Sequence, residues 1–293
     1  MSISWTAYGP HVSVLDSPER GGYPYANSLL VRGSAESVLI DPSRGLLDAP
    51  PATDLTLVSH GHEDHMVALD RYASPVHCHR QDLPIVHDPS LLAQATGAPP
   101  ETLDDITAMV VDEFEVSGRP DAVAFESGST FDLGGCQITV VFLPGHTRGH
   151  CGFLIEPDGF FFTGDIDLTG FGPFYGGLDS NLEDFEASLH ACREVDARWY
   201  GTAHQKGVIE GATDFRERLD AYAGAISRRE AQLMDFLTEP RTLEEIVAHR
   251  IVYRPHVTGP HVDPVERRTA ALHLERLLAS GAVSVNDERY LAR

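Results

Sequence analysis

The chain has 293 residues, 42% of them hydrophobic, so it can bury a sizeable core and is longer than one typical domain. Its net charge is −22 at pH 7 and Lys206 is its sole lysine, a balance that repels polyanions and disfavours extended nucleic acid as a substrate. No apolar run reaches the length of a bilayer crossing, and the four cysteines form no CxxC pair, so we expect a cytoplasmic protein without membrane association.

Short apolar runs in residues 1–41 predict strands, separated by turns at Gly9-Pro10 and Gly21-Gly22. The last of these runs ends at Asp41. Residues 55–58 predict a further buried strand, and a helix is expected to begin near Met66. The loop between that strand and that helix reads His60-Gly61-His62-Glu63-Asp64-His65.

Three imidazoles and two carboxylates in one loop are hard to explain by packing. Imidazole nitrogen and carboxylate oxygen are ligands of borderline divalent metals such as zinc. For this motif alone, a solvated histidine-rich loop is the alternative. Glu63 is expected to point into solvent.

Residues 81–118 depart from the strand-rich pattern and predict an inserted pair of helical segments. Insertions at the end of a sheet often act as lids or as walls of a substrate site. An elaborated surface loop is the alternative.

Three later segments each place a histidine or an aspartate after an apolar or small-residue run. They read Gly145-His146-Thr147-Arg148-Gly149-His150, Thr163-Gly164-Asp165 and Gly201-Thr202-Ala203-His204. The stretch that follows Asp165 is rich in glycine and aromatic residues. Its Phe171, Phe174 and Tyr175 are expected to line a pocket.

The C-terminal region, residues 240–293, differs in charge, with eight arginines and seven acidic residues for a net charge of +1. Residues 242–247 predict a capped short helix and residues 264–280 an amphipathic one. A hairpin is expected over residues 283–291, with its turn at Asn286-Asp287. Helix, helix and hairpin resemble a winged-helix module. His256 and His261 in the loop between the helices are expected to be solvated or structural, or to contribute to the pocket.

Five sequence features follow one another along the chain: Asp41, the HxHxDH motif from His60 to His65, His146, Asp165 and His204. In this order they resemble the metallo-β-lactamase fold superfamily of hydrolases. The resemblance implies an α/β fold, an αββα sandwich of two mixed β-sheets flanked by helices. We expect a catalytic domain at residues 1–225, with the 81–118 insertion, and a small winged-helix-like domain at residues 240–293.

A catalytic zinc site takes three protein ligands and leaves one position for water. His60 and His62 flank one glycine, so with His146 they can present three nitrogens to one ion. The resemblance implies that Asp64, His65 and His204 hold a second ion and that Asp165 bridges the two.

The expected cofactors are therefore two divalent metal ions, zinc first, with iron or manganese as alternatives. A hydroxide held between two such ions would be the nucleophile. The family suggests that Asp64 carries a proton to the leaving group. Asp41 is expected to orient a ligand histidine, and His150 either does the same or is a buried structural histidine.

Asp165 replaces the cysteine of the true zinc β-lactamases, which argues against antibiotic hydrolysis. We therefore expect a small-molecule substrate, an ester, a thioester or a lactone. One alternative is an RNA or DNA phosphodiesterase, because the winged-helix-tailed branch of the superfamily includes nucleases. Another is a non-enzymatic, metal-dependent regulator that binds DNA. A second copy of the chain, in a homodimer, is a further candidate partner.

Overall fold

The first sheet of the computed structural model, which describes residues 4–293, has seven strands in sequence order. The pairings from β1 to β4 are antiparallel and those from β4 to β7 are parallel, so the sheet is mixed. Its strands are β1 (Trp5–Tyr8), β2 (Val12–Leu15), β3 (Leu29–Arg32), β4 (Ser37–Ile40), β5 (Leu55–Leu57), β6 (Val76–His79) and β7 (Val123–Phe125).

The second sheet has six strands in the order β13-β12-β11-β10-β9-β8. β11 and β12 are parallel and the other neighbours are antiparallel, so this sheet is mixed as well. Its strands are β8 (Thr130–Asp132), β9 (Gln137–Phe142), β10 (Cys151–Glu156), β11 (Phe160–Phe162), β12 (Trp199–Gly201) and β13 (Val208–Glu210).

The two sheets pack face to face, and alternate side chains of each strand fill the space between them. Val38 and Ile40 of β4 point into this core and Leu39 points out of it. Phe160 and Phe162 of β11 likewise point in, whereas Phe161 points out. This period of two is the geometry of a strand that is covered on both faces. The predicted α/β sandwich of two mixed sheets is confirmed.

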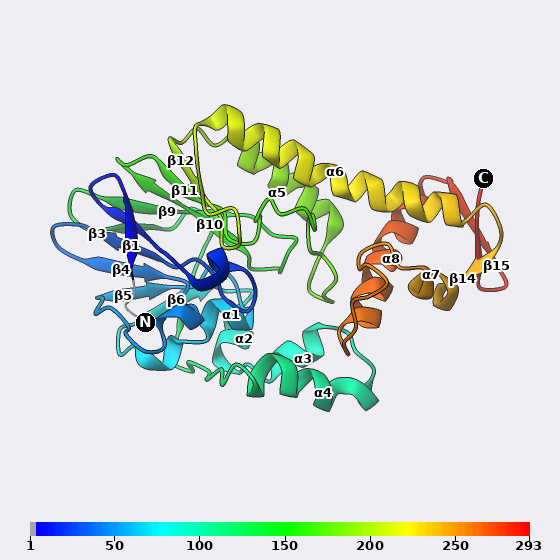
Figure 1. Cartoon of the computed structure of the whole chain (residues 1–293), viewed down its shortest axis with the longest axis horizontal. Coiled ribbons are helices and arrows are strands. Elements are labelled where there is room, and N and C mark those ends of the chain that lie inside the picture. The colour runs from blue at the N-terminus through cyan, green and yellow to red at the C-terminus, as the bar shows by residue number, and fades with distance from the viewer. Residues whose placement is uncertain (1–3) are drawn as a thin grey trace.

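Helices cover both outer faces (Figure 1). The outer face of the first sheet packs against α1 (Glu63–Met66) and against the short helices of the region expected as an insertion. These are α2 (Leu83–His87), α3 (Leu91–Ala95), α4 (Leu103–Thr107) and the π-helical turn η5 (Ala108–Asp112). The outer face of the second sheet packs against α5 (Leu182–Glu194) and α6 (Ala212–Phe236). Short 3-10 turns occupy several connecting loops: η1 (Pro18–Gly21), η2 (Arg44–Leu46), η3 (Leu69–Arg71) and η4 (Pro100–Thr102).

The C-terminal elements form a separate small core at the far end of α6 (Figure 1). They are β14 (Arg241–Thr242), α7 (Leu243–His249), α8 (Val262–Ala279), β15 (Val283–Asn286) and β16 (Arg289–Ala292), and the strands pair in the order β14-β16-β15. The expected domain end at residue 225 falls inside α6, a continuous helix of 25 residues that joins the two parts of the chain.

Two local predictions for this region can be compared with the structure. Thr242 and Glu245 make both hydrogen bonds of a capping box at the start of α7, which confirms the capped helix. The hairpin is present, but its turn lies at Asp287 and Glu288, both with positive φ, one residue later than expected.

None of the helices in residues 4–293 combines the length and apolar character that a bilayer crossing needs.

Candidate metal centre

Five loops place the predicted site residues at one edge of the two sheets. Asp41 follows β4 and His60 follows β5, two parallel neighbours whose carboxyl ends share an edge. Asp165 and His204 follow the parallel strands β11 and β12. His146 lies in the loop after β9, which runs in the same direction as β11 because β10 is antiparallel to both. Strand direction therefore explains why segments far apart in the sequence meet here.

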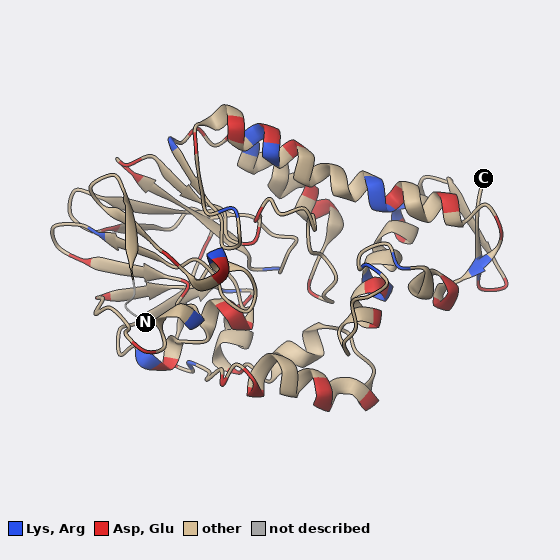
Figure 2. Ribbon diagram, viewed as in Figure 1, with Lys and Arg blue, Asp and Glu red and all other residues tan. Residues whose placement is uncertain are grey.

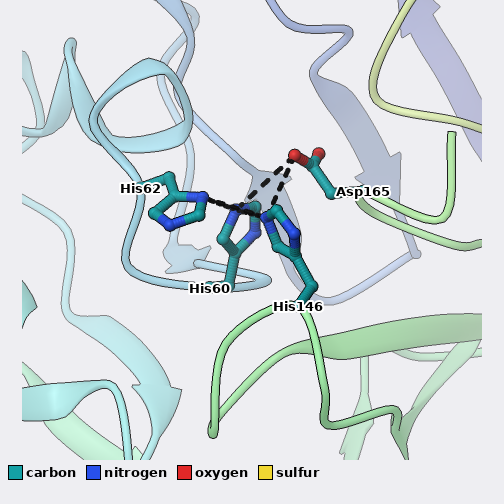
Figure 3. A group of neighbouring side chains, drawn as sticks. All are labelled: His60, His62, His146 and Asp165. Carbon is teal, nitrogen blue, oxygen red and sulfur yellow. Dashed lines mark hydrogen bonds and ion pairs between the residues drawn. The ribbon is translucent and has the colours of Figure 1, made fainter. Parts of the chain in front are cut away.

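A first donor set consists of three histidines and one oxygen of Asp165 (Figure 3). The Nε2 of His146 lies 3.2 Å from the Nε2 of His60 and 2.9 Å from the Nδ1 of His62. The nitrogens of His60 and His62 lie 3.1 Å apart. The Oδ2 of Asp165 lies 3.2 Å from His146 Nε2 and 3.8 Å from His60 Nε2.

A second donor set consists of Asp64, His65 and His204. The Nε2 of His204 lies 3.3 Å from the Oδ2 of Asp64. The other oxygen of Asp165, Oδ1, lies 3.0 Å from His65 Nε2 and 3.3 Å from His204 Nε2. The carboxylate of Asp165 therefore presents one oxygen to each set.

In four histidines a hydrogen-bond acceptor binds the outer ring nitrogen, so in the neutral ring the inner nitrogen carries the free lone pair. Nδ1 of His146 donates to the carbonyl of Phe174 at 3.0 Å, and Nδ1 of His204 to that of Gly21 at 2.7 Å. A carbonyl can only accept, so in both rings the inner Nε2 keeps a free lone pair in the neutral form. Such outer hydrogen bonds are typical of histidines that bind metals.

Asp41 holds the other two histidines. Its Oδ2 accepts from His65 Nδ1 at 2.8 Å and from the hydroxyl of Ser59 at 2.7 Å. The Ser59 oxygen in turn lies 3.0 Å from His60 Nδ1, and since its own proton goes to Asp41 it accepts there. One fully buried carboxylate thus orients a histidine of each donor set.

Two buried atoms in the site lack a hydrogen bond to anything in residues 4–293: His65 Nε2 and Asp165 Oδ1. They lie 3.0 Å apart without the alignment that a hydrogen bond needs. Polar atoms are rarely left unpaired in a buried site. Nitrogens around a tetrahedral zinc ion lie about 3.3 Å apart, given Zn–N bonds of about 2.0–2.1 Å. The spacing of the first set and the unpaired atoms of the second therefore fit divalent metal ions.

The pKa shifts of the site residues also fit bound divalent cations. Burial, aided by neighbouring histidines, lowers the pKa values of His60 and His62 well below the usual range, so both rings are neutral. Burial also lowers the pKa of His204, but Asp165 and Asp64 outweigh it and raise that pKa to about 10. Burial would raise the pKa of Asp165, but His204, His65 and His60 hold it well below the usual range. The carboxylates thus attract positive charge, which a bound cation would supply.

His150 lies beside the donor sets and not in them. Its Nδ1 lies 2.9 Å from the carbonyl of Leu143, and its Nε2 accepts from the backbone N–H of Asp165 at 3.0 Å. Burial lowers the pKa of His150 to about 3, which keeps the ring neutral and able to accept. His150 therefore fixes the main chain that carries Asp165.

Asp82 is a buried residue of the site that the sequence interpretation missed. Its carboxylate accepts from Gly61 N–H at 3.0 Å, from Gly149 N–H at 2.7 Å and from the Thr147 hydroxyl at 2.6 Å. It therefore joins the loop of His60 and His62 to the loop of His146. A Cβ on Gly149 would lie 2.5 Å from the Asp82 carboxyl carbon, which explains the glycine. Asp82 stands in the region expected as an insertion, and no local pattern distinguishes it there.

The expectation for Glu63 was wrong. Its side chain is buried and accepts at 3.0 Å from the hydroxyl of Tyr23, which lies between β2 and β3, so it does not point into solvent. Burial and the neighbouring Asp64 raise the pKa of Glu63 to about 7.

A cavity of about 420 Å³ opens beside the donor sets. His62, Asp64, His146, Asp165 and His204 line one part of it, and Phe171 and Phe174 lie in its wall. His261 also lines the cavity, whereas His256 is exposed.

Tyr175 does not line this cavity. It is 1% exposed and lies in the core of the second sheet's helical layer, where its hydroxyl is 2.9 Å from His273 Nε2. The buried Arg229 of α6 donates to the carbonyls of Phe171 and Pro173, and its guanidinium lies 5.2 Å from the centroid of the Tyr175 ring.

Comparisons with known proteins agree with this geometry. A family model described as a beta-lactamase superfamily domain matches residues 22–221. The acyl-coenzyme A thioesterase MBLAC2 of Bos taurus is 27% identical over 174 residues, which cover 50% of this chain and 59% of the relative. The atrochrysone carboxyl ACP thioesterase dmxR1 of Cryptosporiopsis sp. is 22% identical over 233 residues, which cover 76% of this chain and 61% of the relative. The chain thus spans about three fifths of the length of these curated relatives.

Two solved structures are similar over nearly the whole chain. A metallo-beta-lactamase family protein, TTHA1429 from Thermus thermophilus, has a TM-score of 0.74 at 23% identity and covers 98% of this chain and 100% of its own. A beta-lactamase domain protein from Burkholderia ambifaria has a TM-score of 0.76 at 19% identity. The match covers 99% of this chain and 94% of that protein's chain. At these identities the likeness shows the fold, and it includes the C-terminal elements.

Proposed function

The chain belongs to the beta-lactamase superfamily of hydrolases, and from this premise we propose that it is a dinuclear metal-dependent hydrolase of small carboxylic esters, thioesters or lactones, with thioesters as the first class to test. The observation that carries the proposal is the convergence of seven side chains into two donor sets that share Asp165. His60, His62, His146 and one oxygen of Asp165 would hold one ion. Asp64, His65, His204 and the other oxygen would hold the second.

Divalent ions at these positions would polarise a carbonyl oxygen and lower the pKa of a water molecule. Nitrogen and oxygen donors suit zinc, and metal analysis would distinguish it from iron or manganese.

The chain's own residues supply orientation and proton transfer. Asp41 keeps His65, and through Ser59 also His60, in the orientation that points a free lone pair inward. His150 fixes the main chain at Asp165. In hydrolysis the water oxygen bonds to the carbonyl carbon and gives up one proton, the bond to the leaving oxygen or sulfur breaks, and that atom takes up the same proton. Asp64 lines the cavity beside His204, so we assign that proton transfer to its carboxylate.

The choice of a thioester first is supported by the relatives, which are named an acyl-coenzyme A thioesterase and an atrochrysone carboxyl ACP thioesterase. A small-molecule substrate is also supported by the charge distribution. Figure 2 shows Lys and Arg interspersed with Asp and Glu along α6 and the C-terminal elements, an arrangement that does not favour a polyanion.

We further propose that residues 1–225 form the catalytic domain and that residues 240–293 form a winged-helix-like module. Two helices followed by a hairpin that pairs with β14 support this module, and so does its own core, which includes Ile246, Leu274 and Val283. We assign the module a packing role and not a role in binding DNA, because its charge is close to neutral.

The test is elemental analysis of the native protein, followed by assays on p-nitrophenyl esters, acyl thioesters, lactones and a phosphodiester. We expect about two metal ions per chain, turnover of at least one carbonyl substrate and none of the phosphodiester. Turnover of the phosphodiester alone, or full activity in metal-free protein, would contradict the proposal.

A further inference from the structure

The cavity beside the donor sets is built from three parts of the chain that lie far apart in the sequence. Apart from the donor sets, its lining is largely apolar. Leu92, Ala95, Met109 and Val110 come from the helices α3 and η5, Phe171 and Phe174 from the loop after Asp165, and Tyr253 and Val265 from the C-terminal region. Largely apolar cavities with a few polar groups at one place are typical of small-molecule sites.

The C-terminal region supplies one wall of the cavity. Val265 is buried near the start of α8 and packs against the backbone of Gly176. A Cβ added at Gly176 would lie 2.4 Å from Val265 Cγ1, so the two segments are in close contact. The ring of Tyr253 lies 5.6 Å from that of Phe171, centroid to centroid. The cavity wall at Val265 therefore depends on both α8 and the loop after Asp165.

The region expected as an insertion supplies a second wall. Leu92 and Val110 are buried in the core on the outer face of the first sheet, so their positions are set by that core. The carbonyl of Ala95 accepts from the N–H of Leu178 at 2.7 Å. This bond ties the end of α3 to the same loop that contacts α8.

These walls are joined to one another in the structure. Arg268 of α8 donates to the carbonyls of Gly177 at 3.3 Å and Ser180 at 3.2 Å. Arg229 of α6 donates to the carbonyl of Phe171 at 2.9 Å. Hydrogen bonds from α6, α8 and α3 thus all end on the loop of residues 171–180. The cavity is consequently already formed, and no lid has to close to make it.

We propose that this cavity binds the linear acyl chain of the substrate, and that Val265 and Ala95 limit the chain length. The inference rests on the proposed function, since the carbonyl carbon of the ester or thioester would lie at the donor sets. Methylene groups gain free energy when they leave water for an apolar surface, so the lining favours a hydrocarbon chain over a polar group. Ala95 of α3 and Val265 of α8 both line the cavity, so a change in the size of either side chain changes the room for the acyl chain.

The test compares Val265→Ala and Ala95→Leu with the wild type on p-nitrophenyl esters and on the matching N-acetylcysteamine thioesters with acyl chains from two to twelve carbons. In the wild type, kcat/KM should rise about fourfold for each added methylene up to an optimum and then fall. Val265→Ala should move the optimum to a longer chain and Ala95→Leu to a shorter one, by about one or two carbons. If the optimal chain length shifts only with thioesters, or only with esters, the result identifies the substrate class. It also supports the assignment of the cavity to the acyl chain.

The matched control is Val262→Ala, the same substitution in the same helix, at a buried residue that is not among those lining the cavity. It should keep the wild-type optimum. A flat dependence on chain length, or one optimum shared by all four proteins, would overturn the inference while leaving the hydrolase proposal in place.

Calorimetric titration with butyrate, hexanoate, octanoate and decanoate tests the cavity without turnover. Affinity should rise with chain length in the wild type and level off earlier in Ala95→Leu. If no ester or thioester is cleaved but this pattern holds, the proposed reaction fails and the cavity assignment stands. If affinity does not depend on chain length, the cavity assignment fails.

Discussion

Asp165 lies between the two donor sets. Its two carboxylate oxygens face different donor sets, at 3.2 Å from His146 Nε2 and 3.0 Å from His65 Nε2. Its backbone N–H is held by His150, and its carbonyl accepts from the hydroxyl of Tyr222 at 3.1 Å. The main chain of Asp165 is therefore held on both sides, by His150 and by Tyr222.

Asp165→Ala should lower the metal content to less than half and reduce kcat/KM by at least about a thousandfold, because it removes a ligand from both ions at once. Elemental analysis and steady-state kinetics measure the two effects. Asp167→Ala is the control, since the Asp167 side chain makes a local hydrogen bond to the N–H of Thr169 and is in neither donor set. Full metal content in Asp165→Ala would show that the bridging assignment is incorrect.

Asp41 orients the histidines His65 and His60 but is in neither donor set. Its φ of +53° is in the left-handed region, which aspartate and asparagine tolerate better than most residues. Asp41→Asn therefore keeps the backbone but places an amide where two donors, His65 Nδ1 and the Ser59 hydroxyl, need an acceptor. We expect metal affinity to fall about 10- to 100-fold, measured by competition with a chromogenic chelator.

Asp54→Asn is the matched control for Asp41→Asn. Asp54 also accepts from a serine N–H and hydroxyl, those of Ser37, but it lies at the surface away from the site. Its metal affinity should equal that of the wild type. Equal affinities in all three proteins would mean that Asp41 does not orient the ligands.

At the scale of elements, the site depends on loops that are held to one another as well as to their strands. Asp82 joins the loop after β5 to the loop after β9 through three hydrogen bonds. The second loop also needs Gly145, whose φ is +125° and where a Cβ would lie 2.3 Å from the backbone nitrogen of Phe185 in α5. The loop of His146 is therefore confined between α5 and Asp82.

Asp82→Ala should lower the free energy of unfolding by about 3 kcal/mol, because three buried donors lose their acceptor. Urea unfolding monitored by fluorescence measures the change. Asp88→Ala removes an exposed carboxylate that accepts from the N–H and hydroxyl of Ser90, and it should change stability by less than about 0.5 kcal/mol. Equal stabilities of the two variants would rule out the joining role of Asp82.

At the scale of the whole molecule, the metal centre and the cavity depend on different contacts. The donor sets lie where the two sheets of the sandwich meet at one edge, and every donor comes from residues 60–204. The cavity needs the C-terminal elements in addition, since Tyr253 and Val265 line it. The long helix α6 connects the two, with Tyr222 bonded to Asp165 and Arg229 bonded to Phe171.

Removal of metal should therefore lower the stability of the whole molecule. At a free ion concentration of 1,000 times Kd, binding stabilises the folded state by about 4 kcal/mol, which corresponds to roughly 10 °C in unfolding temperature for a protein of this size. Differential scanning calorimetry before and after dialysis against a chelator measures the difference. Readdition of zinc, manganese or iron should restore both temperature and activity, and an unchanged unfolding temperature in metal-free protein would argue against ions held by seven side chains.

The sequence by itself was enough to predict the fold class and to select the seven side chains that meet in the donor sets. It could do so because histidines and aspartates after apolar runs are typical of a metal site, and because their order along the chain resembles that of the metallo-β-lactamase superfamily, which implied the fold and the second donor set. Local chemistry was also sufficient for the capping box at Thr242 and for the C-terminal hairpin. The assignment of each donor to an ion, and the domain limits, stay predictions.

Only the tertiary structure decided which remaining side chains reach the site. Asp82 contacts residues 21 and 65 to 67 positions away, Tyr23 meets Glu63 across 40 positions, and Tyr175 turns to His273 across 98. Local periodicity carries no information about such contacts, because they depend on how separate elements pack. The same reason applies to the cavity, whose walls at Ala95, Phe171 and Val265 come together only when the helices α3 and α8 and the loop after Asp165 are in place.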